Sequence, residues 1–268
     1  MSQDDLNDSE PRREQLLGTI LKAGRVLDLF TVEQPEWGVT EVATALDIAR
    51  ASAYQLLATL TEIDLLRRTP DNRYRLGWRL LSFARTLLES TEFRAEAVHA
   101  MDALANRYRQ AVYLATLDDD EVVCVTNREG ELVVADPGQR LMVHASAVGK
   151  VLISGQSWPT VQHIVERRGL PSFTDNTITR PESLREEWHT VRTQGYAYAI
   201  EETLPNLCCI AAPIQDDSGR VVAALCVSAR SDIFRRHERE ILQSVRRASH
   251  DVSRNLGYLH RGSPRTMK

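Results

Sequence analysis

Apolar residues in the first quarter of the chain recur at helical spacing in three separate stretches. The first amphipathic helix is predicted over residues 16–30, and a short second helix is predicted over 41–46 with Thr40 as its N-cap. A third helix, over 50–63, presents one apolar face made of Ala53, Leu56, Leu57 and Leu60. Two short helices joined by a tight connection have helix-turn-helix dimensions, although other three-helix bundles share this pattern.

A predicted hairpin follows the third helix and favours the helix-turn-helix. Residues 65–68 and 73–76 are typical of two strands, and Pro70, Asp71 and Asn72 supply the turn, with Asn72 tolerant of a positive φ. Five arginines stand against one acidic residue between positions 66 and 79: Arg67, Arg68, Arg73, Arg75 and Arg79. Charged edges also prevent aggregation. After a helix-turn-helix, however, arginines on the solvent face of a wing are better explained by phosphate contact.

The rest of the chain mixes strands and helices. A connecting helix is predicted near 78–88. The expected strands are 112–117, 121–126, 132–135, 209–214 and 221–228. The expected helices are 145–154, 158–168, 181–195 and a last one carrying Ile241, Val245, Ala248, Val252, Leu256 and Leu259. Strands 112–117 and 121–126 meet at Asp118–Asp120, and the last two meet across 216–219. This order predicts an α+β domain with helices packed on a sheet.

Composition narrows the class of protein but does not identify its function. The 268 residues are 43% hydrophobic and 26% charged, as in ordinary globular proteins, and the net charge is −4. Basic residues must therefore be concentrated locally if DNA is the partner. No apolar run is long enough for a membrane helix, and residues 1–14 lack the apolar core of a secretory signal. We expect a disordered leader, a cytoplasmic protein, and four cysteines that behave as small buried hydrophobic residues.

Several motifs together resemble the IclR family of bacterial regulators, along most of the chain from about residue 15 to 259. The matching stretches are 46–50 (LDIAR), 56–60 (LLATL), 65–68 (LLRR), 73–77 (RYRLG), 141–150 (LMVHASAVGK), 177–179 (TIT), 209–213 (CIAAP) and 219–225 (GRVVAAL). The resemblance implies a winged helix-turn-helix, a linker helix and an effector domain related to the GAF fold. It also implies homodimers, or dimers of dimers, that bind operator DNA, commonly of catabolic operons, and respond to small organic acids.

The expected organisation is a leader over 1–14, a DNA-binding domain over 15–77, a linker helix over 78–92, an effector domain over 93–260 and a tail over 261–268. In the DNA-binding domain, the start of the third helix should enter the major groove. The candidate DNA contacts are Arg50, Ser52, Tyr54 and Gln55 on that helix and Arg67, Arg73 and Arg75 in the wing. Tyr54 could equally pack against the wing. Two positions depart from the family: Gln55 replaces a common Arg, and Asp64 replaces a usual Gly.

In the effector domain, the resemblance assigns the pocket to the start of the helix near 145–154 and to strands around positions 199, 207–209 and 226–228. A helix N-terminus there would direct backbone N–H groups at an acidic ligand. The candidate contacts are Ala147, Val148, Gly149, Leu207, Cys209, Cys226 and Ser228. Ala199 replaces a family Asp and Cys226 replaces a Ser, so the pocket is less polar. This favours an aromatic acid over a compact keto acid, although Cys226 could also be simply part of the core.

Two other classes of function are alternatives to a ligand-controlled regulator. An enzyme could use Ser146 and Lys150, four residues apart, as a nucleophile and base. On a helix, however, Ser146 is better explained as a cap and Lys150 as a charge that is solvated or pairs with another helix. The histidines lack metal-binding spacing, Asp118–Asp120 lacks a calcium-loop pattern, and no catalytic, metal or cofactor site is expected. The other alternative is a DNA-binding protein without a ligand, whose second half only dimerises.

Overall fold

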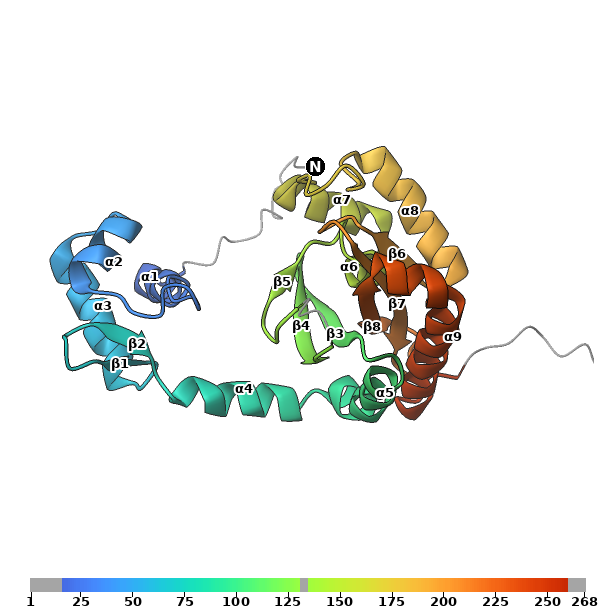
Figure 1. The fold of residues 1–268 in the computed structure, drawn as a ribbon. Coiled ribbons are helices and arrows are strands. Elements are labelled where there is room, and N and C mark those ends of the chain that lie inside the picture. The colour runs from blue at the N-terminus through green and yellow to red at the C-terminus, as the bar shows by residue number, and fades with distance from the viewer. Residues whose placement is uncertain (1–15, 131–134, 260–268) are drawn as a thin grey trace, which may run out of the picture. The chain divides into compact units, whose positions relative to one another are not determined.

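The computed structural model describes residues 16–130 and 135–259, and the chain divides into two compact units. The first unit ends at Leu87 and the second begins at Leu88 (Figure 1). Each unit is described separately below.

The first unit is a winged helix-turn-helix, as predicted. Its elements are α1 (Gly18–Leu27), α2 (Val39–Leu46), α3 (Arg50–Glu62), β1 (Leu66–Arg68) and β2 (Tyr74–Leu76). The predicted inward face of α3 is confirmed, because Ala53, Leu56, Leu57 and Leu60 are all buried in the core of this unit. Ile48, in the turn between α2 and α3, packs against the same core. The three helices therefore share one small core, and β1 and β2 pair beside it as an antiparallel hairpin.

Two details of this unit differ from the prediction. The N-cap of α2 is Gly38 rather than Thr40, because the Glu41 carboxylate reaches back and accepts the Gly38 N–H at 2.9 Å. In α1, Val26 is fully buried, whereas Leu16 and Ile20 are 66% and 65% exposed. The apolar spacing over 16–30 thus predicted the helix correctly, but part of its apolar surface faces outward.

The helix after the wing, α4 (Arg79–Glu89), has no buried residue. Trp78, Leu81, Phe83 and Leu87 are large apolar side chains at or on it that are at least half exposed. A helix gains most of its stability in proteins from packing an apolar face, and among the described residues that of α4 stays largely exposed.

The second unit is built on an antiparallel sheet. The described strands are β3 (Ala111–Asp118), β4 (Glu121–Arg128), β5 (Arg140–Leu141), β6 (Ala197–Ile200), β7 (Leu207–Gln215) and β8 (Val221–Arg230), in the spatial order β5-β4-β3-β8-β7-β6. The two predicted hairpins, β3 with β4 and β7 with β8, are confirmed. The short strands β5 and β6 were not predicted. The predicted strand 132–135 lies outside the described residues except for Ala135, which belongs to no strand.

Helices cover both faces of this sheet (Figure 1). On one face lie α5 (Glu92–Tyr108) and α9 (Ser231–Asn255), and on the other lie α6 (Ala147–Ser154), α7 (Trp158–Arg168) and α8 (Pro181–Gln194). Successive residues of a strand point to opposite faces of the sheet. Because helices cover both faces, β7 is buried on both sides and its sequence is a nearly continuous apolar run. α9 ends before Leu259, which is 82% exposed rather than part of that helix's apolar face.

Candidate DNA-binding and effector sites

The start of α3 presents polar side chains on the face opposite its buried one. Arg50, Tyr54 and Gln55 are exposed and Ser52 is half-buried. Tyr54 is 52% exposed, so its ring is not enclosed by the wing. The core-facing residues hold the helix from behind, and the polar face at its N-terminal end stays accessible to a partner.

The wing places Arg67 and Arg68 at the surface. Both are exposed, and their guanidinium groups lie over aromatic rings: Arg67 is 5.3 Å from the Trp78 ring and Arg68 is 6.0 Å from the Tyr74 ring. Stacking orders the two side chains while their N–H groups remain available to an anion. Asn72 has φ of 60° in the turn between the strands, as predicted.

Arg73 and Arg75 are partly exposed on the wing, and both form ion pairs with acidic residues of the first unit. Arg73 binds the Glu41 carboxylate, with Nη2 2.6 Å from Oε2, and its Nε lies 3.7 Å from Glu36 Oε2. Arg75 forms an ion pair with the other oxygen of Glu36. Glu41 and Glu36 precede Arg73 by 32 and 37 positions, so local sequence patterns did not reveal the pairing.

The junction between α3, the wing and α4 is held by close backbone contacts. Asp64 has φ of 60°, the left-handed conformation for which the family's usual residue is Gly. A Cβ at Gly77 would lie 2.1 Å from the Asp64 carbonyl oxygen, so only glycine fits there without a backbone shift. The Arg79 Nη1 also donates to the Ile63 carbonyl at 2.7 Å. The start of α4 is therefore tied to the end of the recognition helix.

The seven candidate effector contacts come together in the second unit. Ala147, Val148 and Gly149 form the first turn of α6, which packs on the sheet face that carries the remaining four: Leu207, Cys209, Cys226 and Ser228. All seven are buried, and even Leu207 is only 5% exposed. A ligand could reach them only if the segments around them opened.

Polar atoms converge at the centre of this sheet face. Cys209 pairs with Ser228 across β7 and β8, and its Sγ lies 3.0 Å from the Ser228 Oγ. Cys226 Sγ lies 3.9 Å from the same hydroxyl. Burial raises the pKa of the Cys226 thiol, whereas a hydrogen bond from that thiol lowers the pKa of Cys209. Ala199, the third small residue in this row, pairs with Cys209 from β6 and adds no polar group.

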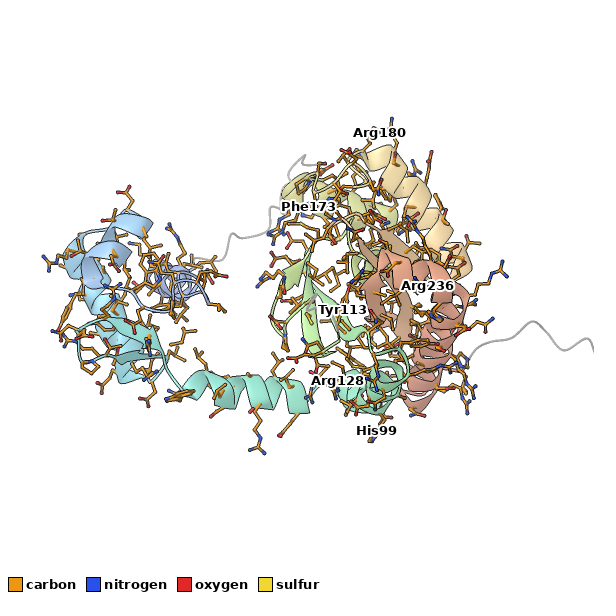
Figure 2. The ribbon with its side chains drawn as sticks, viewed as in Figure 1. His99, Tyr113, Arg128, Phe173, Arg180 and Arg236 are labelled. Carbon is orange, nitrogen blue, oxygen red and sulfur yellow. The ribbon has the colours of Figure 1, made fainter. Side chains whose placement is uncertain are left out.

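Tyr113 belongs to this cluster and was missed in the sequence. It lies on β3 opposite Cys226, is 2% exposed, and burial raises the pKa of its phenol (Figure 2). A tyrosine inside an apolar strand is an unusual choice because its hydroxyl needs a partner when buried. That signal was present in the run 112–117 and could have identified it.

The start of α6 is held by a cap and by a close approach. The Ser146 hydroxyl accepts the Gly149 N–H at 3.1 Å and donates to the Met142 carbonyl at 2.7 Å, which confirms its interpretation as a cap. A Cβ at Gly149 would lie 2.6 Å from both the Cα and the carbonyl oxygen of Val143. The segment before α6 thus lies directly against its first turn.

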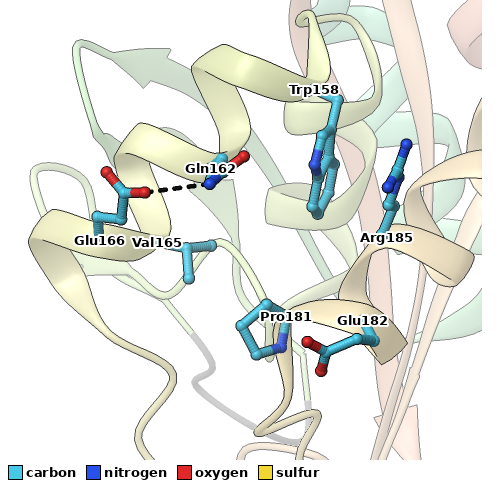
Figure 3. Close-up of a pocket in the computed structure, with 7 residues that line it drawn as sticks. All are labelled: Trp158, Gln162, Val165, Glu166, Pro181, Glu182 and Arg185. Carbon is cyan, nitrogen blue, oxygen red and sulfur yellow. Dashed lines mark hydrogen bonds between the residues drawn. The ribbon is translucent and has the colours of Figure 1, made fainter.

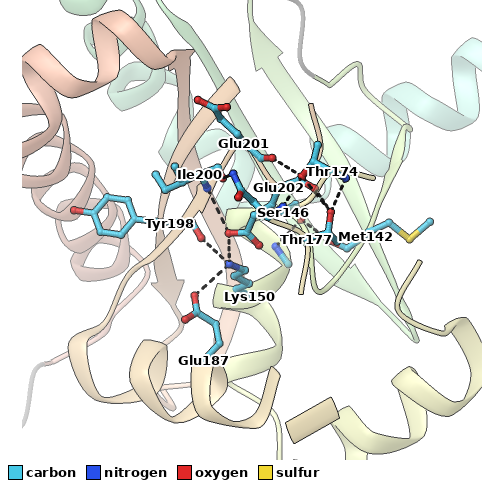
Figure 4. Close-up of polar contacts among 12 residues, drawn as sticks. Met142, Ser146, Lys150, Thr174, Thr177, Glu187, Tyr198, Ile200, Glu201 and Glu202 are labelled. Carbon is cyan, nitrogen blue, oxygen red and sulfur yellow. Dashed lines mark hydrogen bonds and ion pairs between the residues drawn. The ribbon is translucent and has the colours of Figure 1, made fainter. Parts of the chain in front are cut away.

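Lys150 is buried, so of the two predicted alternatives the solvated charge is wrong, while its contact with Glu187 on α8 fits the charge that pairs with another helix. Its Nζ lies 2.6 Å from Glu202 Oε1, 3.0 Å from the Tyr198 carbonyl and 3.3 Å from Glu187 Oε1 (Figure 4). Burial raises the pKa of Glu202, and its Oε2 has no hydrogen-bond partner within the described residues. Because these groups engage the Lys150 ammonium and the Ser146 hydroxyl binds backbone, the two residues do not form a nucleophile–base pair.

Hydroxyl groups extend this network to the loop before β7. The Thr177 Oγ1 donates to the Glu202 carbonyl and the Thr174 Oγ1 donates to the Glu201 carbonyl, each at 2.6 Å (Figure 4). The buried lysine and the two threonines therefore tie α6, the segment before α8 and the β6–β7 loop together. This network lies beside the first turn of α6, which carries three of the candidate effector contacts.

Other features of the surface carry less chemistry. A groove between α7 and α8 is lined by Trp158, Gln162, Val165, Glu166, Pro181, Glu182 and Arg185 (Figure 3). Arg185 already lies over the Trp158 ring at 5.6 Å. Within residues 16–130 and 135–259, no three histidine, cysteine or acidic side chains are grouped as metal ligands, and no helix could cross a membrane. All four cysteines are buried free thiols, as predicted.

Comparison with known proteins identifies both units. Residues 19–70 match the family model described as the IclR helix-turn-helix domain, and residues 85–254 match that of the bacterial transcriptional regulator IclR C-terminal domain. The regulator XynR of Escherichia coli is 31% identical over 91% of this chain and 98% of its own length. The glycerol operon regulatory protein of Streptomyces coelicolor is 29% identical, covering 88% and 95%. An IclR homologue from Microbacterium hydrocarbonoxydans, solved with 4-hydroxybenzoate, has a TM-score of 0.79 and 25% identity, covering 89% and 98%.

Proposed function

Because the chain belongs to the IclR family of bacterial transcriptional regulators, we propose that it represses a catabolic operon under the control of a small organic acid. The observation that carries this proposal is the accessible polar face at the start of α3, formed by Arg50, Tyr54 and Gln55 and backed by a buried apolar face. An operator overlapping the promoter would make such binding repressive.

In this proposal, α3 lies in the major groove and reads base edges. Gln55 can pair with adenine through two hydrogen bonds, and Arg50 can bind guanine or a phosphate. Ser52 and Tyr54 complete the contact surface of α3. The exposed guanidinium groups of Arg67 and Arg68 bind phosphates of the DNA backbone.

The effector is proposed to be an aromatic acid that enters between α6 and the sheet. Its carboxylate would accept hydrogen bonds from backbone N–H groups at the start of α6. Its ring would lie against the small side chains of Ala199, Cys209 and Cys226, and Tyr113 would offer a hydroxyl to a ring substituent. The solved relative that carries 4-hydroxybenzoate has a ligand of this class.

A homodimer is the proposed working unit. Large apolar side chains are exposed at two helices: Leu16, Leu17, Ile20 and Leu21 at the start of α1, and Leu81, Phe83 and Leu87 on α4. Exposed apolar surface is typical of subunit contacts. A symmetric dimer would also match two half-sites of a palindromic operator.

The first test is DNA binding by the purified protein. Fluorescence anisotropy with the DNA upstream of its own gene, at several salt concentrations and beside an unrelated duplex, should reveal selective binding that falls steeply with salt. Equal and weak binding to both duplexes, repeated across genomic fragments, would overturn the regulator proposal for this chain.

The effector is tested with the same protein. Calorimetry should detect 4-hydroxybenzoate and related aromatic acids, and adding the bound acid should change the anisotropy with operator DNA. Tighter binding of pyruvate or glyoxylate would contradict an aromatic effector. If no organic acid raised the thermal unfolding temperature, a second unit that only dimerises would become the better explanation.

A further inference from the structure

The wing is not an isolated hairpin, because a third segment of the chain pairs with β2 on the side away from β1. Trp37 and Tyr74 exchange two backbone hydrogen bonds, at 3.0 and 2.8 Å, so residues 36–38 run beside β2. The Trp37 Nε1 donates to the Leu29 carbonyl at 2.8 Å and fixes this segment from the other side. The wing therefore reaches the helices through the same residues that lead into α2.

Four charged side chains reinforce this connection. The Arg73 guanidinium forms a fork on Glu41, with Nη1 to Oε1 at 3.1 Å and Nη2 to Oε2 at 2.6 Å. The same Nη2 donates to the Glu36 carbonyl at 3.1 Å, and the Glu36 carboxylate meets both Arg73 and Arg75. We call these four residues, Glu36, Glu41, Arg73 and Arg75, the wing cluster.

Glu41 does two tasks within the wing cluster. Its carboxylate binds the Arg73 fork and also accepts the Gly38 N–H that caps α2. The hydrogen bond from Arg73, followed by that from Gly38, lowers the pKa of Glu41, so the carboxylate stays ionised at neutral pH. One side chain thus joins the first turn of the helix-turn-helix to the strand of the wing.

The charges of the wing cluster cancel, so the cluster attracts DNA phosphates only weakly. Two carboxylates balance two guanidinium groups, and a phosphate approaching Arg73 would compete with Glu41 for the same N–H groups while being repelled by it. Arg67 pairs with Arg75 across the hairpin but binds no carboxylate in the described structure. Positive charge on this part of the wing is therefore left to Arg67 and to Arg68.

We propose that Glu36, Glu41 and Arg73 are positioning residues for DNA binding, which hold the wing against α2 so that Arg67 and Arg68 meet the phosphate backbone when α3 lies in the groove. This inference rests on the proposed function, because it assigns roles within the same DNA-binding surface. Arg73 acts through geometry, and its charge does not contribute a phosphate contact.

The test uses the full chain and the DNA fragment that the wild type binds selectively. Glu41→Gln and Arg73→Gln should each weaken binding about tenfold, and the double variant should be no weaker than Arg73→Gln, because both changes remove one interaction. The slope of log affinity against log salt should stay at the wild-type value in all three. Arg220→Gln, which removes the exposed ion pair with Asp216 in the second unit, is the matched control.

A phosphate contact by Arg73 would give the opposite pattern. Arg73→Gln would then lower the salt slope by about 0.9, and Glu41→Gln, by freeing the guanidinium, would tighten binding. Either result would overturn the positioning role while leaving the regulator proposal intact. A wild-type protein that binds no fragment selectively would instead overturn the regulator proposal itself.

Two further variants separate positioning from simple loss of folding. Arg73→Lys keeps the charge but cannot form the fork, so it should bind DNA as weakly as Arg73→Gln, whereas a phosphate-contacting lysine would bind nearly as well as arginine. The charge exchange of Glu41→Arg with Arg73→Glu should recover part of the affinity lost in either single change, because it restores the ion pair although not the cap on Gly38. Thermal unfolding of each variant shows whether the first unit remains folded at the assay temperature. Recovery without any gain in thermal stability would support positioning, and no recovery in a folded protein would argue against it.

Discussion

The best-connected ion pairs of the two units differ in how far they are exposed to solvent. In the first unit the ionic groups lie at the surface, where the wing cluster pairs side chains that are between 28% and 45% exposed. In the second unit Lys150 and Glu202 form an ion pair whose side chains are 3% and 9% exposed. A surface pair contributes little to stability, whereas a buried one is costly to break. The same residue types thus orient a surface in one unit and hold a core together in the other.

This difference indicates where each function resides. A protein that reads DNA must present its chemistry outward, so the side chains that matter in the first unit lie on exposed faces of regular elements. A domain that encloses a small molecule must keep its polar groups inside and satisfied. Substitutions in the first unit should therefore change binding more than stability, and those in the second unit should do the reverse.

The largest effect is expected from Lys150→Met. This change leaves Glu202 and Glu187 without their shared cation in a buried setting, and should lower the free energy of unfolding of the second unit by about 3–5 kcal/mol. Urea unfolding followed through Trp158 and Trp188, which lie in this unit, measures the loss. Arg220→Met, at an exposed pair, should cost less than about 1 kcal/mol. Equal losses in the two variants would remove the contrast between buried and exposed pairs.

Replacing a glycine by alanine should have opposite effects on stability in the two units. Gly149→Ala should destabilise the second unit by about 2 kcal/mol or more, because the new Cβ meets the Val143 backbone. Gly24→Ala, within α1 and with nothing inside 4 Å of the new Cβ, should instead stabilise the first unit by about 0.5–1 kcal/mol. Calorimetric unfolding measures both. A neutral Gly149→Ala would mean that the first turn of α6 moves freely relative to the preceding segment.

On the DNA-facing surface, Gln55→Ala should reduce the preference for operator over unrelated DNA by about 1–2 kcal/mol and leave the salt slope unchanged. Arg67→Gln should weaken binding to both duplexes and lower the slope by about 0.9. Neither change should alter thermal unfolding, because both side chains are exposed. Anisotropy titrations at several salt concentrations distinguish the two. A Gln55 variant that loses affinity equally for both DNAs would not be a base-reading residue.

The smallest expected effect concerns His144, whose ring is fully buried and donates one hydrogen bond, from Nε2, to the Pro171 carbonyl at 3.0 Å. Burial, and to a lesser extent the charge of Lys150, lowers the pKa of His144 below 6.5. The unfolded chain therefore takes up a proton first as pH falls through 6.5, and stability is lost below that pH at up to about 1.4 kcal/mol per unit.

Unfolding free energies between pH 7.5 and 5.5 test this prediction. The His144→Gln protein should lose less stability over this range than the wild type. His99→Gln, at an exposed histidine in α5, should follow the wild-type pH dependence. Parallel curves for the wild type and His144→Gln would exclude a neutral buried imidazole as the cause.

The fold was predictable where the signal is local. Spacing and turn chemistry alone predict the inward residues of α3, the turn at Asn72 and the two long hairpins of the second unit. The resemblance to the IclR family is confirmed, and with it a role as a transcriptional regulator and not as an enzyme. The strands β5 and β6 were not found because two and four residues are too few to show a period.

The polar side chains of the sites were less predictable, because their partners are distant in sequence. Lys150 meets Glu202 across 52 positions, and Arg73 meets Glu41 across 32. No periodicity links such pairs, so the sequence predicts neither the carboxylates that bind Lys150 nor those that bind Arg73. The seven effector candidates came from the resemblance. Their burial on one sheet face agrees with that assignment but leaves ligand contact as a prediction.

The exposed helix α4 has a consequence for engineering. It runs across the division at Leu87 and buries none of its residues, so its sequence can be lengthened without disturbing a core. Each inserted residue would advance the helix by about 1.5 Å and turn everything after it by about 100°. Insertions of seven residues, close to two full turns, would keep the rotational phase, and insertions of one or two would not. A sensor half grafted here from another regulator would therefore work as a biosensor only at certain linker lengths, in a periodic series.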